Sequence, residues 1–303
     1  PGSTFKLFVY TEAMNEGLTP CDKRRDEYIS MQVYDKRKKE MTTWTPTNAN
    51  GSFSGDSIPL KSAFAKSINS VAVRLGQELG IKNIIETAQK MGIESPLDDN
   101  PALALGSSDV NLLELAGAYC TIANNGMHHR PTLVTRIVDS DGNEVFVDKS
   151  TSEQVIPYKS AFFMQKLLMS GTHDGGGTSV SLSAAEYAGN SFRDTDWGGK
   201  TGTSNNHSDA WFVGVSPNLV VGAWVGGEYR SIHFRTGALG QGARTALPIC
   251  GYFIHSVMED PAFQKYHAKF QTPNDESITK DMYDCSPYYA PARNDSSSLH
   301  RDS

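Results

Sequence analysis

The chain has 303 residues, of which 38% are hydrophobic and 20% are charged, and its formal net charge at pH 7 is -6. This composition is that of an ordinary globular protein with one large domain or two small ones, and the acidic balance disfavours a nucleic-acid partner. No apolar run approaches the roughly 18 residues of a membrane-spanning helix, so the sequence predicts neither a transmembrane segment nor a signal peptide.

The first predicted helix occupies the opening stretch PGSTFKLFVYTEAMNEG, with Ser3 as the expected N-cap and Gly17 as the expected stop. Apolar residues cover nearly every face of this helix, so we expect it to be buried. A lysine inside such a helix is costly unless its amine is needed there. Because residues i and i+3 share a helix face, Lys6 can direct its amine at the Ser3 hydroxyl, where a neutral amine would activate the serine as a nucleophile.

The following stretch, residues 18–59, is rich in polar residues, glycine and proline and predicts strands and loops without a clear period. Its charged run at 35–40 is the only basic cluster and indicates a solvated loop or a hairpin tip. Four cysteines stand singly and far apart along the chain: Cys21, Cys120, Cys250 and Cys285. Their spacing gives no disulfide framework and no zinc site, and it leaves their pairing open.

The middle of the chain predicts mainly helices, punctuated by glycine. Residues 61–80 read as two short helical pieces that meet near Ser67, and 81–92 as a further helix. A strongly apolar helix at 111–126 ends in Asn-Gly, the expected C-terminal stop. The predicted elements that follow are a hairpin around an Asp-Gly turn at 131–147 and a helix at 158–171.

The region from 198 to 227 changes character and predicts an antiparallel sheet, with a turn at Ser216-Pro217-Asn218 between its last two strands. A helix at 246–260 follows. Helices before and after an antiparallel sheet indicate an α+β fold with the helices packed on the sheet. We therefore predict one domain over residues 1–268, followed by a polar, disordered tail at 269–303.

Three short motifs occur in a set order along the chain: Ser3-Thr4-Phe5-Lys6, Ser67-Ile68-Asn69 and Lys200-Thr201-Gly202-Thr203. Singly, each is weak, since serines cap helices and lysines solubilise strand ends. Together, S-x-x-K, S-x-N and K-T-G are the signature of penicillin-binding proteins and class A β-lactamases. With the surrounding stretches, the chain resembles the transpeptidase domain of class A, bifunctional penicillin-binding proteins over roughly residues 1–265. The resemblance implies an antiparallel sheet with packed helices plus an all-helical subdomain.

The resemblance also implies roles for the residues of the first two motifs. Ser3 would be the acylated nucleophile and Lys6 its general base. Ser67 would relay a proton to the leaving amine. Asn69 would hold Lys6 in place and hydrogen-bond the amide of the substrate.

In the third motif, the resemblance implies that Lys200 places positive charge opposite the terminal carboxylate of the substrate. The hydroxyls of Thr201 and Thr203 would bind that carboxylate. Gly202, which has no side chain, would let the substrate backbone lie along the strand. The backbone N–H groups of Ser3 and Thr203 would form the oxyanion hole. If Lys200 reaches the same cleft as Lys6, like-charge repulsion should push one amine toward neutrality.

The implied function is that of a serine D,D-transpeptidase that crosslinks peptidoglycan stem peptides ending in D-alanyl-D-alanine, with β-lactam antibiotics as covalent inhibitors. No metal and no cofactor are implied. The implied location is the periplasmic face of the bacterial inner membrane. Since the chain begins at Pro1 directly before a helix, we expect it to be a fragment without the glycosyltransferase domain and membrane anchor of the family. Leu7 stands where the family usually has proline, a change that should affect rigidity more than chemistry.

Alternatives remain open at this point. The same acyl-enzyme could pass to water, which would make the protein a D,D-carboxypeptidase, or the chain could be a non-catalytic β-lactam sensor or scaffold. A β-lactamase is disfavoured because Asp98 breaks the E-x-x-L-N pattern that begins at Glu94. A phosphate-binding loop at 198–201 is disfavoured because Asp194 stands where that motif needs glycine. Trp211 and Trp224 are expected to be sheet-packing residues.

Overall fold

The computed structural model describes residues 1–35 and 38–290. Its α-helices are α1 Lys6–Asn15, α2 Leu60–Ala65, α3 Asn69–Leu79, α4 Ile81–Lys90, α5 Leu112–Ala123, α6 Tyr158–His173, α7 Gly237–Gly240 and α8 Ala246–Glu259. Its strands are β1 Lys23–Arg25, β2 Met31–Asp35, β3 Glu40–Trp44, β4 Ser57–Pro59, β5 Met127–His128, β6 Arg136–Val138, β7 Glu144–Val147, β8 Glu153–Gln154, β9 Gly198–Thr203, β10 Asp209–Val215 and β11 Val220–Gly226. Short 3-10 helices include η1 Gly2–Phe5, η2 Pro101–Leu105 and η6 Pro261–Tyr266.

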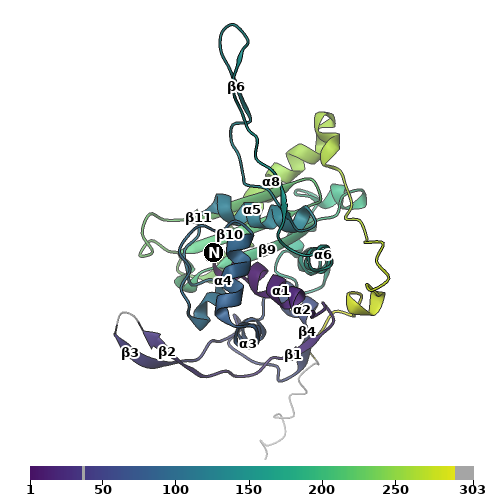
Figure 1. Cartoon of the computed structure of the whole chain (residues 1–303). Helices are drawn as coiled ribbons and strands as arrows, with labels where there is room; N and C mark the ends of the chain where they lie inside the picture. Colours follow the sequence, from purple (N-terminus) through teal and green to yellow (C-terminus); the bar gives the residue numbers. More distant parts are fainter. Residues whose placement is uncertain (36–37, 291–303) are drawn as a thin grey trace, which may run out of the picture.

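The largest sheet has three antiparallel strands in the order β11-β10-β9. Successive side chains of β10 point to opposite faces, as the period of two in a strand requires. Phe212 packs in the cluster formed with α8, whereas Trp211 and Val213 belong to the large core around α1, α5 and α6. Figure 1 shows the helices on the two sides of this sheet. The predicted α+β fold with helices packed on an antiparallel sheet is confirmed.

The predicted burial of the first helix is also confirmed. Along α1, Leu7, Phe8 and Val9 are fully buried, and Lys6 is buried with them. The predicted N-cap at Ser3 is wrong. Ser3 lies inside η1, and α1 begins at Lys6 with no side-chain cap. The reason is that the backbone enters the helix through a 3-10 turn, which carries Ser3 one turn ahead of the α-helical residues.

The two helical pieces predicted to meet near Ser67 are α2 and α3, and α3 stops at Gly80, whose φ is 85°. Together with α1, α4 and α5 they enclose one apolar core, which is the helical part of the fold. The helix α5 is capped by Asn111, whose side chain accepts a hydrogen bond from the Glu114 N–H at 2.9 Å. These elements place the first two motifs side by side at the centre of the molecule.

Two hairpins leave this body (Figure 1). β2 pairs with β3 at the charged run 35–40, where Lys38 and Lys39 are exposed as a hairpin tip requires; residues 36–37 lie outside the described part. The predicted Asp-Gly hairpin is formed by β6 and β7. All of its strand residues are exposed.

The C-terminal segment differs from the predicted disordered tail. Residues 269–290 follow the surface of the domain, and Phe270, Ile278 and Tyr283 pack against the large core. A disulfide joins Cys21 to Cys285 across 264 positions of sequence. This pairing was invisible in the spacing of the cysteines because it depends on the fold. The remainder of the predicted tail, 291–303, is outside the described residues. The described helices include none with the length and apolar character needed to cross a membrane.

Candidate active site

A cleft of about 910 Å³ lies between the η1 turn, the end of β9 and the loop after β3. Ser3, Asn69 and Thr203, one from each of the three motifs, contribute to its lining. Lys6 and Lys200 lie beneath this surface, and their exposed fractions are 0% and 1%. The structure therefore brings the three motifs to one place, although 197 positions of sequence separate Ser3 from Lys200.

The η1 turn that carries Ser3 is held by backbone contacts that leave no room for a side chain. A Cβ on Gly2 would lie 2.7 Å from the carbonyl oxygen of Thr203, and Gly2 has a φ of 53°. Tyr119 donates a hydrogen bond from its hydroxyl to the carbonyl of Thr4 at 2.9 Å. Backbone pressed on backbone in this way holds Ser3 against the end of β9, as glycine allows.

The amine of Lys6 is held by three acceptors from the second motif. Its Nζ donates to the carbonyl of Ser67 at 2.8 Å, to the Ser67 hydroxyl at 3.1 Å and to Oδ1 of Asn69 at 2.7 Å. Among the described residues, none hydrogen-bonds the hydroxyl of Ser3. The predicted proximity of Lys6 to Asn69 is therefore present, whereas a direct Ser3–Lys6 hydrogen bond is not formed in this structure.

Ser67 adopts a left-handed backbone conformation, with a φ of 56°. For a residue with a Cβ this costs about 1–2 kcal/mol, and such strain tends to occur at functional positions. Ser67 sits between α2 and α3, where the conformation turns both its carbonyl and its hydroxyl toward Lys6. The strained position thus presents two acceptors to one amine.

Lys200 reaches the same hydroxyl from the sheet. Its Nζ donates to Ser67 Oγ and to the carbonyl of Thr201, both at 3.0 Å. Burial, reinforced by the charge of Lys200, lowers the pKa of Lys6 well below that of an ordinary lysine. Burial lowers the pKa of Lys200 to about 7. The lowered pKa of Lys6 agrees in direction with the like-charge argument, since the charge of Lys200 contributes to it.

The two threonine hydroxyls of the third motif make different contacts. The Thr201 hydroxyl donates to the hydroxyl of Thr178 at 2.8 Å, and Thr203 Oγ1 accepts the Gly242 N–H at 3.2 Å. At Gly202, a Cβ would lie 2.3 Å from the carbonyl oxygen of Pro1, so the absence of a side chain also makes room for the η1 turn.

Several cleft residues have no counterpart in the predicted site: Trp44, Asp109, Asp209, Trp224, Glu228 and Arg230. Trp44 ends β3 and stands two positions before Pro46 in a polar stretch of the sequence, a local context that gives no signal of a cleft residue. Trp211 and Trp224 face each other across β10 and β11, and both line the cleft, which goes beyond the sheet packing predicted for them. The Trp224 indole donates to Asp209 at 3.0 Å.

Glu94 does not take part in this site. It lies within 4.0 Å of Arg130 with 73% of its side chain exposed, and it is absent from the lining of the cleft. Within residues 1–35 and 38–290, no group of three His, Cys, Asp or Glu residues is placed to hold a metal ion.

Comparison with known proteins bears on this arrangement directly. Residues 1–225 match the model of the penicillin-binding protein transpeptidase domain. The chain belongs to this family. The resemblance to a penicillin-binding protein transpeptidase domain that the three motifs suggest is confirmed.

Similar proteins include penicillin-binding protein 2D of Bacillus subtilis, 32% identical over 234 residues, which are 76% of this chain and 32% of that protein. Penicillin-binding protein 1A of Neisseria cinerea is 31% identical over 255 residues, 82% of this chain and 30% of that protein. The chain thus spans about a third of the length of these relatives.

Solved structures of similar fold include penicillin-binding protein 1A from Haemophilus influenzae, with a TM-score of 0.75, 26% identity and coverage of 90% of this chain and 43% of that one. PonA1 from Mycobacterium tuberculosis in complex with penicillin V has a TM-score of 0.72 at 23% identity, covering 90% of this chain and 71% of that one. The second likeness concerns the fold alone.

Proposed function

We propose that this protein is a serine D,D-transpeptidase that crosslinks peptidoglycan stem peptides ending in D-alanyl-D-alanine. The observation that carries the proposal is the meeting of two buried amines, those of Lys6 and Lys200, at the hydroxyl of Ser67. Burying two lysines costs stability, and a catalytic use of the amines accounts for their burial. An uncharged amine one turn from a cleft-lining serine is what acyl transfer by serine requires.

In the proposed acylation, Ser3 Oγ attacks the carbonyl between the two terminal D-alanines while its proton passes to the neutral Lys6 amine. An Oγ–C bond forms, the C–N bond to the last D-alanine breaks, and Ser67 relays the proton from Lys6 to the departing amine. The amine of a neighbouring stem peptide would then attack the ester: an N–C bond forms, the C–Oγ bond breaks, and the proton of the amine returns to Ser3 Oγ through Lys6. The N–H groups of Ser3 and Thr203 would stabilise the oxyanion in both steps, a contribution of about 10²–10³ in rate per donor.

The terminal carboxylate of the substrate is proposed to lie by Lys200, Thr201 and Thr203. Protonated Lys200 would supply positive charge, and the two threonine hydroxyls would donate hydrogen bonds. Among the described residues β9 pairs with no strand other than β10, and we propose that an extended peptide would add to its other edge. Asn69 would bind the amide of that peptide from the opposite side of the cleft.

The same chemistry makes β-lactams covalent inhibitors. Their strained amide would acylate Ser3, and Glu94, the glutamate that would activate a deacylating water in a β-lactamase, does not line the cleft. The PonA1 structure is a complex with penicillin V, and penicillin-binding protein A of Mycobacterium tuberculosis forms an imipenem acyl-enzyme. Action on peptidoglycan further places the working domain on the extracytoplasmic side of the membrane.

Product analysis tests the proposal. The protein is incubated with a stem peptide that ends in D-alanyl-D-alanine and a second stem peptide that offers a free amine. A crosslinked dimer together with released D-alanine supports transpeptidation, whereas D-alanine without dimer identifies a D,D-carboxypeptidase. Formation of neither product, with slow acylation by penicillin, identifies a sensor or scaffold. Ser3→Ala should abolish both products.

A further inference from the structure

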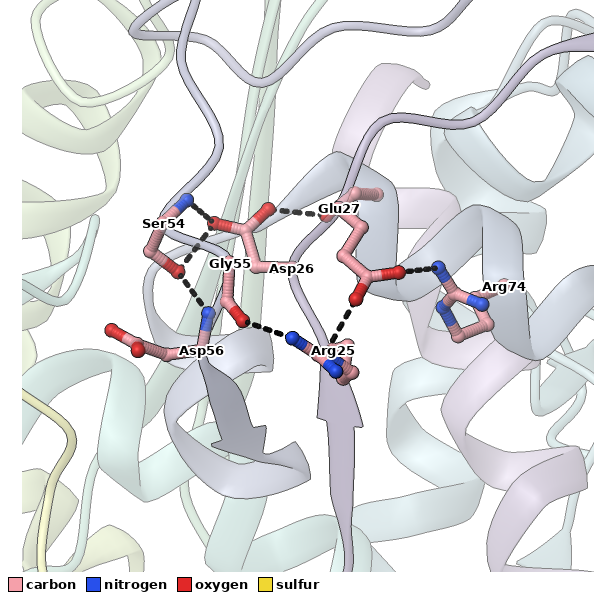
Figure 2. Close-up of polar contacts among 8 residues, drawn as sticks. Arg25, Asp26, Glu27, Ser54, Gly55, Asp56 and Arg74 are labelled. Atoms are coloured by element: carbon pink, nitrogen blue, oxygen red, sulfur yellow. Dashed lines mark hydrogen bonds and ion pairs between the residues drawn. The ribbon is translucent and has the colours of Figure 1, made fainter.

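A buried carboxylate lies behind the candidate site. Asp26 directly follows β1 and is 4% exposed. Its Oδ1 accepts hydrogen bonds from Ser70 Oγ at 2.6 Å and Asn48 Nδ2 at 2.7 Å. Its Oδ2 accepts from the N–H of Ser54 at 2.8 Å and from Ser54 Oγ at 2.9 Å, as Figure 2 shows. Four donors thus converge on one carboxylate that the catalytic chemistry does not use.

The neighbouring charges do not neutralise this carboxylate. Figure 2 shows Arg25 paired with Glu27, and Glu27 paired with Arg74. Burial opposes ionisation of Asp26, but the hydrogen bonds from Ser70, Ser54 and Asn48 outweigh it and hold its pKa below the ordinary value. The side chain is therefore an ionised acceptor that depends on oriented donors.

One of those donors, Asn48, also caps the helix that carries Asn69. The residue before α3 is Ile68, which has no polar side chain to serve as a cap. Asn48 Oδ1 instead accepts the N–H groups of Asn69 at 3.0 Å and Ser70 at 3.1 Å. Its Nδ2 faces Asp26, so the carboxylate determines which end of the amide meets the helix.

Asn69 is consequently held through both its backbone and its side chain. The loop fixes its backbone through Asn48, and its own Nδ2 donates to the carbonyl of Thr47 at 2.8 Å. Only its Oδ1 remains to meet the Lys6 amine, at 2.7 Å. A chain of contacts therefore runs from Asp26 through Asn48 and Asn69 to Lys6.

We propose that Asp26 and Asn48 are positioning residues for acylation, which fix the Asn69 side chain and through it the Lys6 amine. This inference rests on the proposed function. A misplacement of about 1 Å at reacting groups can cost 10²-fold in rate, so a change of amide orientation at position 48 should be felt in the chemical step.

An exchange of the two side chains tests the proposal. Asn48→Asp sets two carboxylates against each other. Asp26→Asn introduces an amide whose NH₂ group must face either Nδ2 of Asn48 or the donors of Ser54, so that two donors meet in both orientations. The double exchange D26N/N48D restores one amide donor opposite one carboxylate acceptor. We expect each single variant to lower the limiting rate of acylation by a fluorescent penicillin about tenfold or more, with less than about threefold change in its Kd. The double variant should recover part of that loss.

A second readout separates positioning from folding. If Oδ1 of Asn69 no longer meets Lys6, the charged amine loses an acceptor, and the acidic limb of the acylation-rate profile should move to lower pH. Asp260→Ala is the matched control. It removes the cap of η6, a hydrogen bond from the Ala262 N–H at 2.9 Å, and neither residue lines the cleft. It should lower the melting temperature without changing the acylation rate or its pH profile.

The outcomes are distinct. Rates are normalised to the folded fraction. Ser54→Ala provides a mild variant, because it removes a single hydroxyl donor. We expect a two- to threefold loss of acylation rate, about the effect of one weakened hydrogen bond. If the wild type is acylated and all of these variants react at its rate, the positioning proposal is overturned. Failure of the double exchange to recover any rate would also contradict it. If the wild type itself forms no adduct, the proposed function fails instead.

Discussion

Lys6 and Lys200 donate hydrogen bonds to the same oxygen, the hydroxyl of Ser67, at 3.1 and 3.0 Å. Both amines are buried, and two charged amines at one oxygen would repel each other. Repulsion at this distance therefore favours the loss of a proton from one of the two amines. In the proposed mechanism Lys6, whose pKa burial and the charge of Lys200 lower well below the ordinary value, acts as the base, and Lys200 is the amine that retains a proton near neutrality.

The pH dependence of acylation should reveal this division. Since burial lowers the pKa of Lys200 to about 7, the second-order rate constant for an anionic penicillin should fall as the pH rises through about 7 and Lys200 loses its charge. The methyl ester of the same penicillin lacks the carboxylate and should show no fall in that range. Stopped-flow acylation at a series of pH values measures both. An identical alkaline limb for acid and ester would argue against Lys200 as the carboxylate partner.

Burial of Lys200 should also cost stability, in a pH-dependent way. A lysine whose pKa is lower in the folded than in the unfolded state binds fewer protons when folded, so stability rises with pH between the two values. Lys200→Met removes this penalty and should raise the melting temperature at pH 6, by about 2–4 °C for each kcal/mol gained. The gain should shrink between pH 7 and pH 10. A difference in melting temperature between the two proteins that stays constant with pH, or a lower melting temperature for the variant at pH 6, would contradict a lowered pKa of Lys200.

Gly202 offers a steric test of how η1 is seated. Gly202→Ala places a Cβ 2.3 Å from the carbonyl oxygen of Pro1, backbone that cannot move without displacing Ser3. We expect acylation to fall at least about tenfold. Gly222→Ala is the control in the same sheet, because the nearest atom to its Cβ is Cδ1 of Leu112, at 3.1 Å, which can adjust, and its other neighbours lie at 3.9 Å. Equal acylation rates for the two variants would show that the η1 contact does not set the site.

The Cys21–Cys285 disulfide should stabilise the fold by restraining the unfolded chain. Cys285→Ser is expected to lower the free energy of unfolding by about 2–5 kcal/mol, measured by denaturant titration. Cys120→Ser, which removes a free cysteine, is the control. Reducing agent should lower the stability of the wild type and leave that of Cys285→Ser unchanged. Equal stability of the wild type and Cys285→Ser would contradict a structural role for the bond.

Local sequence patterns predicted most of the elements. The apolar face of α5 and its Asn-Gly end, the two pieces on either side of Ser67, and the strands of the sheet were all readable because each depends on neighbouring residues. The prediction that the three motifs form one site came from their order along the chain, which matches a family signature, rather than from any local pattern.

What escaped prediction depends on contacts between distant segments. Asn48 caps α3 from a loop 21 positions away, and its role could not be read from a polar stretch without a period. The Cys21–Cys285 bond and the packing of residues 269–290 likewise exist only once the chain has folded. The 3-10 entry into α1 misled the assignment of Ser3 as a cap, since propensity does not separate a 3-10 turn from the first turn of an α-helix.

The most direct test of the central claim is mass spectrometry of the protein after reaction with penicillin. We predict a mass increase of one penicillin per chain, mapped after proteolysis to the peptide that contains Ser3, and its loss in Ser3→Ala. Lys6→Ala should remain unmodified over the same time while keeping Ser3. An adduct that persists in Ser3→Ala, or a wild-type protein that stays unmodified, would contradict the account.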